Sequence, residues 1–347
     1  MENRLKMNSY QRRRNLMADR ISTLPDRSYL IINRSYNGFS KFIYRTMRNR
    51  DHHQPITTFR LQCGSSHFNL SDVNRWVNSA VQRGLENLYI QLFYQIFPKL
   101  IKSCIFSCKT LVVLKLFGLN VDVFSFVHLP SLKTLQLYCL IFPEPQYVME
   151  LLSGCPILEY MHLSRMRYAD CSSPSNTNVK SLTKLVSADI SFIGFEIPLK
   201  VICNVEFLRI DKYPYEIPVF PNLTHLELMM SGIGMNWHLV LAMLKKCPKL
   251  QKLLLDMKAS STHDMVWTSP FNDPECLSSQ LRKCSITNYK GTKSELHFAT
   301  YIMQSSRVLQ TMAIDTAPSS EQGDKFEMIK ELSLCPRSSA ICQLSFK

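Results

Sequence analysis

Glycine-rich catalytic and nucleotide-binding patterns are missing from this chain of 347 residues, which has only 10 glycines. G-x-G-x-x-G and the P-loop, whose glycines let the backbone approach phosphates, do not occur. The serine-hydrolase pattern G-x-S-x-G and the zinc-protease pattern H-E-x-x-H are also missing. The sequence therefore predicts no enzyme, no catalytic residue and no cofactor.

Long uninterrupted apolar runs are missing as well. The most apolar stretch, Leu111–Leu129, is interrupted by Lys115, Asp122 and His128, and a charge at mid-membrane would cost several kcal/mol. The first 19 residues are polar and rich in arginine, unlike the apolar centre of a signal peptide. We therefore expect no membrane association and a location in the cytoplasm, the nucleus or both.

The 12 cysteines are not spaced like a disulfide framework. Most lie in apolar runs or at predicted helix ends, and examples are Cys139, Cys155, Cys203, Cys247, Cys284 and Cys335. Buried, reduced thiols of a cytosolic or nuclear protein are the better interpretation. Cys104 and Cys108 have no second cysteine pair with which to hold zinc, and His52-His53 is best interpreted as a solvated loop, so we predict no metal site.

Positive charge is concentrated in the first 50 residues. The whole chain has 41 Lys and Arg against 27 Asp and Glu, but residues 1–50 alone have twelve against three. The remainder is nearly neutral, which argues against a nucleic-acid-binding body. For the cluster Arg12-Arg13-Arg14, a solvated tail is favoured over nucleic-acid binding or nuclear import.

The most informative feature is an L-x-x-L-x-L pattern, with other apolar residues allowed, that recurs twelve times. Successive copies begin 18 to 32 residues apart, close to the 20–29 typical of leucine-rich repeats. The copies begin at Ile56, Leu85, Leu111, Leu132, Leu158, Leu185, Val205, Leu223, Leu250, Leu281, Leu309 and Ile341.

This pattern predicts an α/β fold, a leucine-rich-repeat solenoid in the form of a horseshoe. The last two apolar positions of each copy are two residues apart, so they share one face of a short strand. Stacked copies would form a parallel sheet on the concave face, with mixed helices on the convex face. Helical spacing indicates helices at 72–82, 146–152, 237–245 and 295–304. An ordinary α/β protein with parallel strands is the alternative.

The residues between the strand leucines should point away from the core, onto the concave face. Their mixture of aromatic and charged types suits protein recognition, although any repeat must have a solvated face. The candidate partner-binding residues are Tyr89, Gln91, Lys115, Phe117, Gln136, Tyr138, Tyr160, His162, Phe207, Arg209, His225, Glu227, Lys252 and Asp256, with Asn87 beside them.

Both ends of the chain resemble a known family. Asp19-Arg20-Ile21-Ser22-Thr23-Leu24-Pro25-Asp26 resembles the opening of a plant F-box, and the C-terminal part resembles an FBD domain. The FBD-like segments are 274–279, 288–291, 307–309, 328–333, 335–339 and 342–346. The chain is thus similar to plant F-box/FBD/leucine-rich-repeat proteins, with a basic N-terminal segment at 1–53, repeats at 54–267 and an FBD domain at 268–347.

This resemblance implies a non-catalytic, substrate-recognition subunit of an SCF-type cullin E3 ubiquitin ligase. In the family, the F-box binds a Skp-type adaptor and thereby the cullin, and the repeats bind the target protein that is ubiquitinated. The adaptor-binding residues carried over are Ile21, Leu24, Pro25 and Asp26. No cofactor, membrane or nucleic acid is implied.

The sequence departs from the family after Asp26. Residues 27–50 lack the tryptophan-containing end of an F-box, so the F-box is expected to be truncated or degenerate. An adaptor-binding helical hairpin could still use Leu30, Ile31, Ile32, Phe39, Phe42, Ile43 and Tyr44. The alternative is a repeat-only interaction module or decoy, because residues 19–26 alone cannot supply the roughly 800 Å² per partner of a stable interface.

Overall fold

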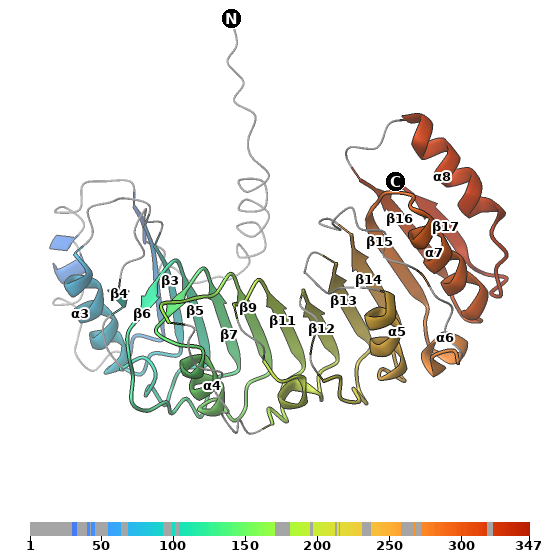
Figure 1. The fold of residues 1–347 in the computed structure, drawn as a ribbon. Helices are drawn as coiled ribbons and strands as arrows, with labels where there is room; N and C mark the ends of the chain where they lie inside the picture. Colours follow the sequence, from blue (N-terminus) through green and yellow to red (C-terminus); the bar gives the residue numbers. More distant parts are fainter. Residues whose placement is uncertain are drawn as a thin grey trace, which may run out of the picture.

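The computed structural model describes residues 30–32, 40–41, 43–45, 55–63, 69–92, 99–100, 104–170, 181–194, 197–211, 214, 216–230, 237–257, 267, 272–317 and 322–347. Within these residues, thirteen strands form one sheet in which every neighbouring pair is parallel, and successive strands follow one another along an arc (Figure 1). Its strands are β1 (Leu30–Ile32), β2 (Thr58–Cys63), β3 (Asn87–Leu92), β5 (Val113–Phe117), β7 (Thr134–Tyr138), β9 (Tyr160–Ser164), β11 (Ser187–Ser191), β12 (Phe207–Ile210), β13 (His225–Met229), β14 (Lys252–Asp256), β15 (Lys283–Tyr289), β16 (Thr311–Thr316) and β17 (Gln343–Phe346). The predicted α/β class with parallel strands is confirmed.

Each of the twelve L-x-x-L-x-L copies contains one strand, from β2 to β17. Burial alternates along the strands as the pattern requires, for example in β3, where Leu88 and Ile90 are buried and Tyr89 is half-buried. The first residue of each copy is also buried, except in the last copy, where Ile341 is 63% exposed. The apolar face of the sheet is therefore the core of the molecule, and it spans all the repeats.

Helices connect several of the strands, and Figure 1 shows α4, α5 and α6 along the outer side of the arc. The described helices are α3 (Leu70–Val81), α4 (Gln146–Ser153), η1 (Leu199–Ile202), α5 (Trp237–Lys245), α6 (Glu275–Ser279), α7 (Lys293–Ser305) and α8 (Gln322–Leu334). The four helices predicted from apolar spacing are α3, α4, α5 and α7, and their centres are confirmed. In α7, Thr292 and Glu295 form a reciprocal capping box at its start. The short α6 and η1 and the weakly amphipathic α8 were not predicted.

Several strands end in a residue with left-handed backbone. Gly118, Cys139, Arg165 and Phe192, with φ of 70°, 53°, 54° and 53°, directly follow β5, β7, β9 and β11. The N–H groups of the first three each donate to a carbonyl of the next strand at 3.0 Å. Shortly after the first three turns come β6, β8 and β10, which form a second parallel sheet with β4, in the order β10-β8-β6-β4. Its strands are β4 (Lys99–Leu100), β6 (Asn120–Val121), β8 (Ile141–Phe142) and β10 (Arg167–Tyr168).

The prediction of a helical hairpin in the N-terminal segment is wrong at residues 30–32, which form a strand. Residues 30–32 are strand β1, which pairs with β2 in the register Leu30↔Leu61. A strand forms here because β2 offers an open sheet edge whose backbone groups need partners. The candidate residues Phe39 and Phe42 lie outside the described residues, as do Ile21, Leu24, Pro25 and Asp26 of the F-box remnant.

The helical part of the prediction holds at residues 43–45, but this segment faces the repeats. Ile43 is only 3% exposed, and the Tyr44 hydroxyl donates to Asp72 Oδ1 at 2.7 Å. The Tyr44 ring meets the edge of Trp76 at a centroid distance of 6.0 Å, and Ser40 Oγ donates to Asp72 Oδ2 at 3.3 Å. The segment is therefore attached to α3.

The ten cysteines whose side chains the structure describes are free thiols, and six of them are buried. Burial raises the pKa of the Cys155, Cys276 and Cys284 thiols to about 12, so they act as small apolar core residues. Within the same part of the chain, no helix is both long enough and apolar enough to span a membrane.

Gly118 is expected to be essential to the stacking of the repeats. A Cβ at this position would lie 2.3 Å from the carbonyl oxygen of Leu92, and φ is +70°. We predict that Gly118→Ala lowers the free energy of unfolding by about 2–4 kcal/mol, because left-handed strain and a backbone clash add. Urea denaturation followed by circular dichroism measures this change.

Gly84→Ala is the matched control, because Gly84 also has a positive φ, +78°, but apart from its chain neighbours no described residue has an atom within 4 Å of the position that a Cβ would take there. It should cost only about 1 kcal/mol. Equal losses for the two variants would show that the clash with Leu92 contributes nothing.

Candidate partner-binding face

The outward side chains of the large sheet stand in rows, because its parallel strands are in register. The central row runs Tyr89↔Lys115↔Gln136↔His162↔Asp189 and continues through Arg209 to Glu227. All fourteen predicted residues are exposed or half-buried and alternate with buried neighbours along their strands. They lie on one face of the sheet, and their contact with a partner stays a prediction.

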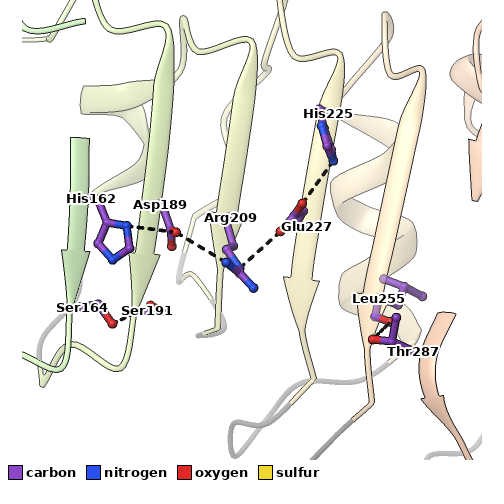
Figure 2. Close-up of polar contacts among 9 residues, drawn as sticks. All are labelled: His162, Ser164, Asp189, Ser191, Arg209, His225, Glu227, Leu255 and Thr287. Atoms are coloured by element: carbon purple, nitrogen blue, oxygen red, sulfur yellow. Dashed lines mark hydrogen bonds and ion pairs between the residues drawn. The ribbon is translucent and has the colours of Figure 1, made fainter. Parts of the chain in front are cut away.

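Charged side chains on β9 to β13 form a chain of contacts that we call the charge ladder (Figure 2). His162 Nδ1 lies 3.3 Å from Asp189 Oδ2, which is 3.6 Å from Arg209 Nη1. Arg209 Nε lies 3.3 Å from Glu227 Oε2, and Glu227 Oε1 lies 3.3 Å from His225 Nε2. Each of the four strands contributes, and the two carboxylates of Asp189 and Glu227 share the single guanidinium of Arg209.

The electrostatics of the ladder follow from its partial burial. The side chains of Asp189 and Glu227 are only 16% exposed. Burial lowers the pKa of His162, against the opposing effect of Asp189, while nearby Arg209 lowers it further. The pKa of Glu227 is lowered chiefly by its hydrogen bond with His225. Below the ladder in Figure 2, Ser191 Oγ donates to Ser164 Oγ at 2.9 Å.

Aromatic and basic side chains on β2 to β7 form a second cluster, the aromatic–cation patch, which consists of Arg60, Tyr89, Lys115, Phe117 and Tyr138. Ring centroids are 5.4 Å apart for Tyr89 and Phe117, and 6.0 Å apart for Phe117 and Tyr138. The Arg60 guanidinium lies over the Tyr89 ring, 4.5 Å from its centroid. Burial, and then the charge of Arg60, lower the pKa of Lys115.

At one edge of this patch, Arg165 reaches over two rings. Its guanidinium carbon lies 5.9 Å from the centroid of Tyr138 and 5.7 Å from that of Phe192. Cation–π contacts of this kind hold a flexible side chain against the sheet face.

Four residues that make these contacts were not predicted. Arg60 and Asp189 lie in the copies that begin at Ile56 and Leu185, while Arg165 and Phe192 directly follow a strand. The sequence signal that could have found Arg60 and Asp189 is their place two residues after a strand begins, the same as Tyr89 and His162.

The central row of the candidate face has no charged residue toward the C-terminus. Beyond Glu227 the central row continues through Leu254, Ser285, Ala313 and Ser345, whose side chains are uncharged. Among the described residues, no group of three or more His, Cys, Asp or Glu side chains could hold a metal ion. His52 and His53 lie outside the described residues.

Two protein-family models match this chain, one in its repeats and one in its C-terminal part. A model of the FBD matches residues 270–314, and a model of the leucine-rich repeats of the FBD-associated F-box protein At5g56370 matches residues 73–193. The chain is a relative of the plant F-box/FBD/leucine-rich-repeat proteins. Three of the segments that suggested the FBD, at 274–279, 288–291 and 307–309, lie within the FBD match.

Individual relatives from Arabidopsis thaliana align along most of their length. The probable FBD-associated F-box protein At1g32375 is 28% identical, over 92% of this chain and 89% of its own. The FBD-associated F-box protein At5g56380 is 26% identical, over 90% and 86% of the two chains. The F-box/FBD/LRR-repeat protein At5g56420 is 26% identical, over 89% and 85%.

These relatives are longer than this chain within the aligned region. The first alignment has 385 positions, whereas 92% of 347 residues is about 319. Some 66 positions of that relative's alignment therefore have no counterpart in this chain, which is consistent with one or more missing segments.

The charge ladder should make stability depend on pH. The native pKa of His162 is lowered from 6.5, so the unfolded chain binds a proton more readily as pH falls through 6.5. We predict that the free energy of unfolding decreases between pH 7.5 and 5.5, and that His162→Gln weakens this decrease. Denaturant titrations at the two pH values measure it.

His297→Gln is the control, because His297 is exposed on α7 and far along the chain from the ladder. It should leave the pH dependence as in the wild type. A pH dependence that is unchanged by His162→Gln would exclude His162 as its source.

Proposed function

We propose that this protein is a non-catalytic substrate-recognition subunit of an SCF-type cullin E3 ubiquitin ligase. In this proposal the repeats bind a target protein, and the F-box remnant binds a Skp-type adaptor that connects the target to the cullin. The observation that carries the proposal is the face of in-register aromatic and charged residues on a sheet that matches the FBD-associated repeat model.

The arrangement of the strands supports a recognition role. We infer that the arc in Figure 1 is a leucine-rich-repeat horseshoe, with the row of outward residues on its concave face. Repeat proteins of this kind use an extended concave surface for binding. Because the row continues over many strands, the candidate surface is long enough for an extended target segment.

A repeat-only decoy is the second candidate, and the N-terminal segment favours it. The residues expected to offer an adaptor-binding hairpin are engaged within the chain, β1 with β2 and Tyr44 with Asp72. A decoy would bind the same targets without bringing them to the ligase. The two candidates share the binding face and differ only in adaptor binding.

A cytoplasmic or nuclear location is part of the proposal. The free, buried thiols of the described residues suit a reducing compartment, which is also where cullin ligases act. The proposal requires no cofactor and no bond chemistry by the chain itself.

Adaptor capture distinguishes the two candidates. If the chain is a ligase subunit, the intact protein retains a purified Skp-type adaptor, and the double variant Leu24→Ala, Pro25→Ala loses it. These residues belong to the F-box-like segment, so their apolar contact area would be lost. Pull-down with purified components measures retention, and equal melting temperatures verify that both proteins are folded.

A substitution on the face of the sheet, Tyr138→Ala, is the matched control and should leave adaptor capture unchanged. Failure of the intact chain to retain the adaptor would exclude the ligase role and leave the decoy.

Target binding is tested on the face itself. We predict that Tyr89→Ala, Tyr138→Ala and Phe207→Ala each reduce the amount of target captured by at least about fivefold, because large rings supply most of an interface's energy. Quantitative mass spectrometry of captured proteins measures the loss. Phe326→Ala, which removes a 66% exposed ring on α8, should capture the same targets as the wild type.

A further inference from the structure

The last of the twelve L-x-x-L-x-L copies differs from the others in burial. In each of the eleven copies that begin between Ile56 and Leu309, all three apolar residues of the pattern are buried. In the last copy, which contains β17, Ile341 is 63% exposed, and Leu344 and Phe346 are half-buried although they pack against the core. Within the described part of the chain, the core is therefore incompletely covered at its C-terminal end.

The described residues treat the two ends of the large sheet differently. At the N-terminal end, β1 pairs with β2, and Ile43 is buried nearby against the repeats. At the C-terminal end of the arc in Figure 1, β17 pairs with β16 on one side, and no described strand pairs with its other side. The terminal units of repeat proteins need a covered or polar outer side, so this half-buried apolar end favours a further contact.

The hydrogen bonds of β17 show which backbone groups lie at its open edge. The N–H groups of Gln343 and Lys347 both donate toward β16, each at 2.9 Å. Because alternate residues of a strand direct their N–H and C=O groups to the same side, Ser345 also faces β16, whereas Leu344 and Phe346 face away from it. Within β17 there is neither a proline nor a charged side chain, two of the devices that prevent pairing at a sheet edge.

A second copy of the chain fits this edge in a symmetric register. If two β17 strands pair antiparallel about a two-fold axis at Ser345, Leu344 of each copy lies opposite Phe346 of the other. Each of these pairs exchanges two backbone hydrogen bonds, so the contact uses both open residues of both strands. A register centred on Leu344 would instead place Phe346 opposite Cys342, whose N–H already donates to the Ser339 carbonyl at 3.2 Å.

The side chains of β17 suit the same register. On the apolar face, Leu344 would meet Phe346 of the other copy, and such pairs of aliphatic and aromatic side chains stabilise neighbouring strands. On the outward face, Ser345 would meet its own equivalent and Gln343 would meet Lys347, so no like charges are opposed. One contact would thus cover the open ends of two cores.

We propose that two copies of the chain associate through β17, in an antiparallel pairing centred on Ser345 that joins their two large sheets into one. The occupant of the edge is a second copy because the contact is self-complementary, and a two-fold contact of this kind closes on itself at the dimer. The inference does not depend on the proposed function. It places two candidate partner-binding faces in one assembly.

Sedimentation equilibrium of the full-length chain tests the association. The chain has a mass of 40.2 kDa, and a dimer has twice that mass. Because the contact is small, the measurement compares chain concentrations of about 1–100 μM. We expect the mass to rise with concentration and to level off at the dimer value. A monomer at every concentration, or a mass that continues to rise beyond the dimer, would overturn the proposal.

Substitutions at the two-fold axis locate the contact. Ser345 is half-buried on the outward face, so Ser345→Lys leaves the apolar face unchanged and opposes two like charges only in the dimer. We expect it to raise the dimer Kd at least about tenfold, and Ser345→Glu to do the same. An equimolar mixture of the two variants should associate as the wild type does, because opposite charges then meet.

Ser285→Lys is the matched control for these substitutions. Ser285 is also half-buried in the outward row, but it lies on β15, which has a strand on each side. Its substitution should change the dimer Kd by less than about twofold, and equal melting temperatures verify that all variants are folded. Dimers that Ser345→Lys does not weaken would show that the copies meet elsewhere, and the proposal would then be wrong.

The variant Ser345→Cys tests the register itself. In the proposed pairing, the two Cα atoms at position 345 are about 4.5 Å apart, which is within the range of a disulfide bond. Mild oxidation should therefore convert this variant into a covalent dimer on a non-reducing gel, whereas the wild type and Ser285→Cys should stay monomeric. Equal amounts of covalent dimer in all three proteins would contradict the proposed register.

Discussion

The structure depends on a constraint that no single repeat can meet: a short strand with one apolar face buries that face only when other strands stand beside it. Leu114 and Leu116 of β5 are fully buried because β3 and β7 flank them and outer segments cover them. Burial of such side chains contributes about 1.5–3 kcal/mol each. Because each repeat supplies the walls for its neighbours, the stability of one unit is shared along the sheet.

That constraint also creates the candidate face. To stack their apolar residues, the strands must keep one register, and a register that aligns Leu88 with Leu114 also aligns Tyr89 with Lys115. A slip by one residue would exchange the two faces. The packing that stabilises the sheet therefore also determines which outward residues become neighbours on the candidate face. The charge ladder is the clearest example, because the shared register aligns side chains from four strands that are joined by connections of different length.

The elements that repeat along the chain could be predicted from the sequence, whereas elements that occur only once could not. Twelve strands followed from apolar spacing, because each copy repeats the same two buried positions. β1 was missed because three residues are too few to display a period. α8 was missed because its exposed apolar residues, such as Phe326 and Leu334, obscure the spacing of the buried Met328 and Leu332. The outward positions were predictable, but the contact of Asp189 with both His162 and Arg209 was not, since it depends on the relative placement of three strands.

The N-terminal segment shows how the same constraint bears on function. A sheet that began at β2 would expose a row of unpaired backbone groups, and such an edge invites pairing with other chains. β1 covers that edge, and the helical residues 43–45 fasten the segment to α3 through Tyr44 and Asp72. Residues that cover an edge cannot at the same time form an independent hairpin on an adaptor. Any adaptor binding must then come from the F-box-like residues before β1, or require the segment to leave the sheet and give up its contacts there. In the second case, protection of the first repeat and recruitment of a ligase would compete for the same short stretch of chain.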